Sequence, residues 1–126
     1  MLQLVTIPIK IFNFISVKRN TNLTKLKSIK LPSSVTEIQD RAFISTSLEE
    51  IILNRNLTYI GKSPFSTKPK KVYYESTEAD WKNISFGGTV YDINDFLNNL
   101  PLYFYSETYQ DGCWHYDTDN YTPVMW

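Results

Sequence analysis

The residues best suited to binding a metal ion lie close together near the C-terminal end of the sequence, at Asp111, His115, Asp117 and Asp119. The carboxylate spacing of the Asp-Thr-Asp-Asn run at 117–120 resembles the start of a calcium-binding loop. That loop also requires a glycine and a bidentate glutamate, and neither follows Asp117 in this sequence. We therefore predict a polar hairpin turn beside an outward-facing histidine, with no metal and no other cofactor.

Catalytic machinery is equally hard to assemble. His115 is the sole histidine, and no Gly-x-Ser-x-Gly motif marks a nucleophile. Glu49 and Glu50 are adjacent, so in a strand their side chains point in different directions. Gly87-Gly88 lacks the sequence context of a phosphate-binding loop. The sequence therefore predicts a protein that is not an enzyme, since an active site would have to bring His115, Asp117 and a glutamate into one cleft.

Three other features have ordinary interpretations. The basic cluster at 68–71 is short and lies in a neutral chain, which favours a solvent-exposed loop. Cys113 stands beside an aromatic residue in a β-rich context, which favours ordinary packing over a reactive thiol. The Asn-x-Ser/Thr triplet, which matters only in a eukaryotic secretory pathway, occurs at Asn22, Asn56, Asn83 and Asn120.

The composition narrows the classes of function further. The 126 residues suit one domain, and 13 Lys and Arg residues balance 13 Asp and Glu residues. A neutral chain lacks the basic face that nucleic acids require, and it has no bulk attraction to anionic membranes. The single cysteine excludes an internal disulfide and a cysteine-based zinc site. Aromatic residues make up 15% of the chain, which favours β-structure.

The first 17 residues are apolar enough to suggest a signal sequence. They lack a basic start and a small-residue cleavage site, and Pro8 and Lys10 interrupt the apolar run. The run is also too short to span a membrane. We interpret it as a β-rich part of the domain or as the point where a longer protein was cut, and we predict no membrane insertion.

The strongest signal is an internal repeat. When the sequence is shifted by 22 residues, six apolar positions coincide: Leu26 with Leu48, Ile29 with Ile51, Leu31 with Leu53, Val35 with Leu57, Ile38 with Ile60, and Phe43 with Phe65. A weaker copy begins at Leu2, a later one places Val72 and Tyr74 in the strand positions, and a possible fourth strand spans 102–105. A period of this length with the pattern LxxIxL is typical of leucine-rich repeats.

One unit can be interpreted physically. Ile29 and Leu31 alternate with Lys30, so a short strand points the first two inward and Lys30 outward. Pro32 ends the strand because it lacks the N–H that a continuing ladder needs. No unit can close its own core, so the units must stack into a solenoid whose strands form a parallel ladder.

The repeat resembles the BspA-like leucine-rich repeats of bacterial surface proteins and some protists. Their unit reads roughly LxxIxIPxxVxxIGxxAFxxC, and it is similar to LKSIKLPSSVTEIQDRAF (26–43) and LEEIILNRNLTYIGKSPF (48–65). Gln39, Asn54 and Pro64 depart from the usual Gly, Pro and Ala. The resemblance implies a secreted or cell-surface location and a role in binding or adhesion.

The C-terminal part resembles the pieces that close such arrays, in VYYESTEADWKNI (72–84), YFYSE (103–107) and WHYDTDNYTPVMW (114–126). Thr77 and Asp80 form a capping-box pattern that predicts a short helix, and 92–100 predicts another helical turn before Pro101. Trp114 and Tyr116 predict one strand of an aromatic hairpin, and 121–126 predicts the other. We therefore expect leucine-rich repeats over 1–75, about three units with the first degenerate, and a C-terminal cap over 76–126.

The outward positions of the ladder form the best candidate for a binding surface. Thr6, Lys30, Ile52 and Tyr73 align as one column, and Ser28, Glu50 and Lys71 form its neighbour. An exposed apolar pair with a charged rim resembles a small protein interface, although β-propensity alone also places Ile and Tyr in strands. The predicted ligand-binding residues are Lys30, Glu50, Ile52, Lys71 and Tyr73.

Two functions remain open. The first is a non-enzymatic module that binds a protein, such as an extracellular or host-surface protein, through the strand face. The alternative is a structural C-terminal piece of a longer array with no ligand site of its own. The second predicts self-association through an exposed N-terminal repeat, because an uncovered repeat leaves apolar surface in water.

Overall fold

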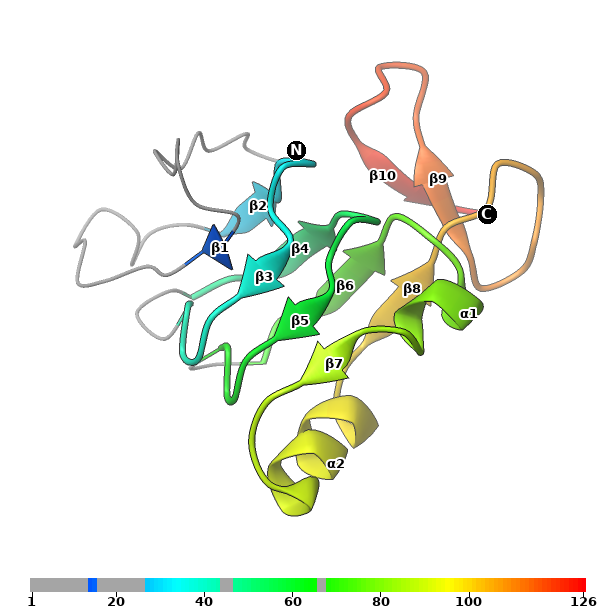
Figure 1. Cartoon of the computed structure of the whole chain (residues 1–126). Coiled ribbons are helices and arrows are strands. Elements are labelled where there is room, and N and C mark those ends of the chain that lie inside the picture. The colour runs from blue at the N-terminus through cyan, green and yellow to red at the C-terminus, as the bar shows by residue number, and fades with distance from the viewer. Residues whose placement is uncertain (1–13, 16–26, 44–46, 66–67) are drawn as a thin grey trace.

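The computed structural model describes residues 27–43, 47–65 and 68–126 in full, and it describes residues 14–15 by their backbone alone. Most of its strands form two parallel four-stranded sheets (Figure 1). One sheet contains β2 (Ser28–Lys30), β4 (Glu50–Leu53), β6 (Lys71–Tyr74) and β8 (Leu102–Phe104). The other contains β1 (Phe14–Ile15), β3 (Glu37–Ile38), β5 (Tyr59–Ile60) and β7 (Ser85–Phe86).

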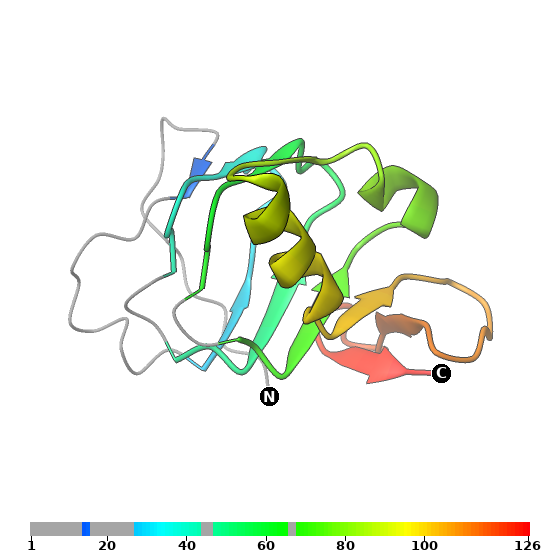
Figure 2. The same cartoon turned by 90° about the horizontal axis from the view of Figure 1, so that it is seen from below.

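The remaining elements gather toward the C-terminal end of the ladders. They are α1 (Glu78–Trp81), α2 (Val90–Asn98) and an antiparallel hairpin of β9 (Trp114–Tyr116) and β10 (Pro123–Met125). In Figure 1 the hairpin rises above β6 and β8, whereas α2 lies below β7. Seen from below, α2 stands in front of the two ladders (Figure 2).

The register of the strands confirms the repeat. Ile29 pairs with Ile51, Ile51 with Val72, and Val72 with Leu102. The fourth strand predicted at 102–105 is β8. A further bridge joins Phe43 to Phe65, the pair predicted to coincide, and their rings stack with centroids 5.6 Å apart. The weaker copy that begins at Leu2 lies outside the described residues.

The main core lies between the two sheets. Ile29, Ile51 and Val72 are fully buried there, as are the partners that the other sheet contributes, Ile38 and Ile60. Burying one such side chain contributes about 1.5–3 kcal/mol of stability, so stacked units supply what a single unit cannot. Toward the C-terminal end the core becomes aromatic, with Tyr74, Trp81, Phe86 and Phe104 in contact.

One departure of the second unit from the family pattern, at Asn54, has a local explanation. Asn54, which stands where the family has proline, is buried and fully bonded. Its Nδ2 donates to the carbonyl oxygens of Pro32 at 2.7 Å and Val35 at 2.9 Å, and its Oδ1 accepts from the N–H of Asn56 at 2.7 Å. Asn54 therefore joins the turns of two successive units. Gly61 keeps the family's glycine because a Cβ there would collide with the backbone nitrogen of Asp40.

Each helix begins directly after a threonine that caps its N-terminus. The side chain of Thr77 accepts from the N–H of Asp80, as predicted. Thr89 and Asp92 form a complete capping box, so α2 begins at Val90, two residues before the predicted start. Phe96 of α2 stacks on Phe65 with centroids 6.4 Å apart and continues the column that Phe43 begins. The division at 75/76 stays a prediction, although β7 and β8 beyond it extend the two ladders.

Among the residues that the structure describes, no helix has the length and apolar character needed to cross a membrane.

Candidate functional site

The two predicted columns exist on the outer side of the β2-β4-β6-β8 sheet. Lys30 pairs with Ile52 and Ile52 with Tyr73, in register with Tyr103 of β8. The neighbouring column runs from Ser28 through Glu50 to Lys71. Thr6, predicted to begin the first column, lies outside the described residues.

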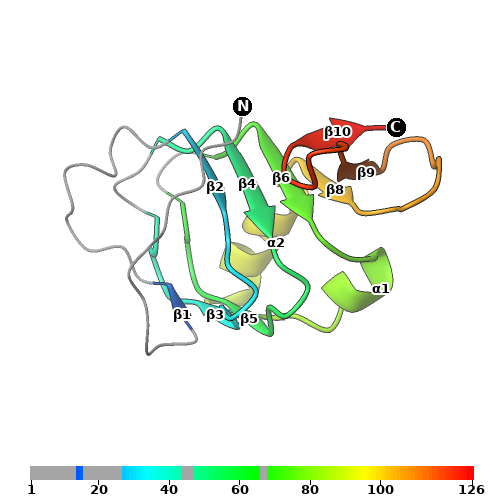
Figure 3. The ribbon, with the colours of Figure 1, turned by 90° about the horizontal axis from the view of Figure 1, so that it is seen from above.

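The expectation that Ile52 and Tyr73 form an open apolar pair is wrong. Ile52 is 0% exposed and Tyr73 is 3% exposed. The C-terminal hairpin covers them, and it lies on the side of this sheet that faces away from the other sheet (Figure 3). The sequence predicted the hairpin correctly but placed it over the end of the core, because nothing in its own residues shows which face it covers.

Trp114 is the centre of this contact. It is completely buried, and its ring centroid lies 5.2 Å from that of Tyr73 and 5.1 Å from that of Tyr105. Its indole N–H donates to the carbonyl oxygen of Tyr74 at 2.9 Å, so the one polar group of the side chain is bonded. We call this second apolar cluster the outer cluster: Ile52, Tyr73 and Trp114, with Tyr103, Tyr105, Tyr116, Tyr121 and Met125 packed around them.

Tyr116 joins the hairpin to charged residues of the repeats. Lys30 Nζ lies 4.3 Å from the centroid of its ring, a cation–π contact. Its hydroxyl donates to Glu75 Oε2 at 2.7 Å. Lys30, predicted as a ligand-binding residue, thus already has a partner within the chain. Glu75 was not predicted, and no sequence signal separated it from any other surface carboxylate.

Burial raises the pKa of two phenols of the outer cluster, Tyr73 and Tyr116. It raises the pKa of Tyr73 to about 12, and the nearby charge of Glu50 adds to this effect. Burial is also the largest cause of the raised pKa of Tyr116. The hydrogen bond to Glu75 and the negative charge of that carboxylate raise this pKa further. Tyr73 and Tyr116 therefore contribute neutral phenols to the outer cluster at neutral pH.

The hairpin turn uses its carboxylates internally. Asp119 Oδ1 accepts from the N–H groups of Tyr121 and Thr122, and Oδ2 accepts from the Thr122 hydroxyl at 2.6 Å. These bonds, the one from the hydroxyl first, lower the pKa of Asp119. His115 stacks on Trp126 with centroids 3.7 Å apart. In the described part of the chain, no three His, Cys, Asp or Glu side chains are placed to hold a metal ion.

Glu50 and Lys71 are the predicted ligand-binding residues of the neighbouring column, and both stay half-exposed. They lie next to the covered pair, so the charged rim of the predicted surface remains accessible while its apolar centre does not. Their role in binding stays a prediction.

A comparison with known protein families matches residues 2–99 to the BspA type leucine rich repeat region (6 copies). No curated protein and no solved structure matches the chain. The matched region covers more than half of the 126 residues and includes both ladders up to α2. The chain belongs to the BspA-type leucine-rich-repeat family.

Proposed function

We propose that this chain closes a BspA-type repeat array at a cell surface, with no enzymatic activity. The observation that supports this proposal best is the complete burial of Trp114 on the outer side of the ladder. A repeat array must cover the apolar surface of its last unit. Here the hairpin covers Ile52 and Tyr73 on the outer face of the ladder, and both side chains would otherwise be exposed to water.

Other contacts at the same end support a capping role. Trp81 of α1 and Phe96 of α2 pack against the main core beside β6, β7 and β8. Both helices lie between ladder strands of the last units, whereas the described residues between the earlier strands contain no helix. BspA-type repeats are commonly surface or adhesion modules, which supports a secreted or cell-surface location.

The test is to remove contacts between the hairpin and the outer face of the ladder without changing the main core. Tyr116→Ala removes the contacts to Lys30 and Glu75 and opens one side of the outer cluster. We expect the variant to keep its circular dichroism spectrum but to bind an apolar dye and to associate in sedimentation velocity. Tyr109→Ala is the control, because Tyr109 is an equally aromatic residue that is 73% exposed. A monomeric, dye-free Tyr116→Ala protein would contradict capping.

Binding of a protein partner at the outer face is the second candidate. It is favoured by Glu50 and Lys71, which stay half-exposed beside the hairpin. A charge exchange, Glu50→Lys with Lys71→Glu, preserves the total charge but reverses the pattern that a partner would meet. Loss of binding to an immobilised extracellular protein in the exchange variant alone, at low salt, would support this candidate. Equal binding by both proteins would exclude this part of the face.

A further inference from the structure

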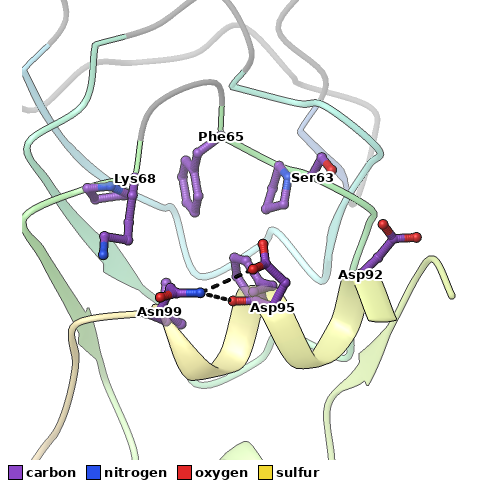
Figure 4. A pocket seen from close by; sticks show the side chains of 10 residues that line it. Ser63, Phe65, Lys68, Asp92, Asp95 and Asn99 are labelled. Atoms are coloured by element: carbon purple, nitrogen blue, oxygen red, sulfur yellow. Dashed lines mark hydrogen bonds between the residues drawn. The ribbon is translucent and has the colours of Figure 1, made fainter. Parts of the chain in front are cut away.

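A hollow of about 180 Å³ opens between α2 and the loop that leads into β6 (Figure 4). Phe65, Phe96 and Leu100 provide its apolar lining, and the rings of the two phenylalanines lie nearly parallel, 20° apart. An apolar cavity of about 150 Å³ in another protein holds a benzene ring. This hollow therefore has room for one aromatic side chain. It shares no residue with the outer cluster.

The charged groups at the rim are not equally available. Asp92 accepts from the N–H of Thr89 at 2.9 Å and from its hydroxyl at 2.8 Å, and it lies 3.8 Å from Lys62 Nζ. Asp95 accepts one bond, from Asn99 Nδ2 to Oδ1 at 3.2 Å, which leaves its other oxygen for a ligand. Lys68 makes no ion pair within the described part of the chain.

The basic run at 68–71 separates into three environments. Lys70 pairs with Glu49, with Nζ 3.6 Å from the carboxylate, and Lys71 belongs to β6 on the outer face. Of the three lysines, only Lys68 lines the hollow, together with the neighbouring Pro69. In Figure 4 the side chain of Lys68 lies on the same side of Phe65 as Asn99, while Asp92 stands at the other end. One free cation and one partly free carboxylate thus flank an apolar floor.

We propose that this hollow anchors an aromatic residue of a partner polypeptide. The aromatic ring lies against Phe65 and Phe96, Lys68 Nζ donates to a backbone carbonyl, and Asp95 accepts from a backbone N–H. A donor and an acceptor on the rim of one hollow suit a neutral peptide better than a lone anion or cation. Aromatic side chains in such pockets supply a large share of the affinity of protein interfaces. This site does not depend on the capping role of the hairpin.

The test uses N-acetyl-L-phenylalanine amide. This molecule has one aromatic ring, and the amide group on each side of the residue supplies an N–H donor and a carbonyl acceptor. It is titrated into the full ¹⁵N-labelled chain and followed by NMR. We expect saturable shifts at the amides of Phe65, Phe96 and Asn99 with a dissociation constant of roughly 1 mM, as for a small ligand in an open site. N-acetyl-L-leucine amide should bind at least about threefold more weakly, because it cannot stack on the rings.

Matched variants distinguish binding in the hollow from non-specific binding elsewhere on the surface. Lys68→Gln and Asp95→Asn both change exposed residues, and each should weaken binding by about threefold. Lys70→Gln, two residues from Lys68, should leave the dissociation constant unchanged. The proposal is overturned by shifts that centre on the hairpin, by equal affinity for the two amides, or by equal effects of the Lys68 and Lys70 changes. It is also overturned if no saturable shift occurs.

Discussion

The two sides of the β2-β4-β6-β8 sheet are built on different rules. On the inner side every unit repeats the same kind of residue, with Ile29, Ile51, Val72 and Leu102 in one row. On the outer side the residue changes from unit to unit: Lys30, Ile52, Tyr73 and Tyr103. The change from charged to aliphatic to aromatic marks the part of the face that the hairpin covers. Repetition therefore encodes the core, and the loss of repetition marks where the hairpin docks on the outer face.

The two clusters also differ in how they are held. The main core contains mostly aliphatic side chains that the stacking of units buries. The outer cluster is mainly aromatic and has polar links, from Trp114 to the Tyr74 carbonyl and from Tyr116 to Glu75. Such bonds fix orientation as well as adding stability. The hairpin can therefore sit in one register on the ladder, whereas aliphatic packing alone is tolerant of sliding.

The largest expected difference comes from two adjacent residues of β4. Ile51 and Ile52 are both 0% exposed, but they point to opposite sides of the sheet. Ile51→Ala should lower the free energy of unfolding by about 2–5 kcal/mol, measured by urea denaturation.

Ile52→Ala, the matched change, should loosen the hairpin before the ladders unfold. Its amides 114–116 should lose hydrogen-exchange protection while those of Ile51 and Val72 keep theirs. If both variants lose protection throughout the chain together, the two clusters form one cooperative unit and the contrast between them is wrong.

A smaller effect is expected from the hydroxyl of Tyr116. Tyr116→Phe keeps the ring over Lys30 and removes the hydrogen bond to Glu75. The bond to a charged acceptor contributes about 1.5–3 kcal/mol when desolvated and less here, because Glu75 is only half-buried. The melting temperature should fall slightly, and Glu75→Gln should add little to the loss. Additive losses in the double variant would show that the two groups do not interact.

The raised pKa of Tyr73 predicts a dependence on alkaline pH. Folding raises this pKa from 10.0 to about 12, so the folded state holds the proton more tightly than the unfolded chain. The contribution to stability is complete below pH 10 and is lost as the pH rises through the folded value near 12. Tyr73→Phe should remove this part of the alkaline unfolding, followed by tryptophan fluorescence. An unchanged alkaline midpoint would place Tyr73 in water.

The smallest expected effect concerns Lys30. Its contact with Tyr116 is half-exposed, and such cation–π contacts contribute about 0.5–1 kcal/mol. Lys30→Gln should shift the urea midpoint slightly, and Lys27→Gln, an exposed lysine near the start of β2, should not. Equal midpoints for the unchanged protein and both variants would show that Lys30 does not help to hold the hairpin.

Much of the fold could be predicted because a repeat states the same information several times. The positions of Ile29, Ile51 and Val72 each support the same strand, and errors at one unit are corrected by the others. The start of α1 and the existence of β8 followed from local patterns at Thr77 and Leu102. The predicted start of α2, at residue 92, is two residues late because Thr89 caps the helix and Asp92 completes the capping box.

The candidate site was harder to predict because it depends on a contact between distant segments. Alternation showed that Ile52 and Tyr73 point outward, and this was correct as geometry. The predicted exposure is wrong because Trp114, about forty residues after Tyr73 and about sixty after Ile52 in the sequence, packs on the same face. An aromatic pair facing outward beside a Trp-Tyr hairpin was the available signal, since each apolar group needed a partner.

The docking of the hairpin on the outer face is the central claim, and NMR can test it directly. In a ¹³C-methyl-labelled chain, the Ile52 methyl groups should show nuclear Overhauser effects to the Trp114 indole ring and little broadening by a soluble paramagnetic probe. Ile51, buried on the other side of the same strand, should be equally protected but show no contact with Trp114. Strong paramagnetic broadening at Ile52, with no effect linking it to Trp114, would mean that the outer face is open and that the hairpin does not close the array.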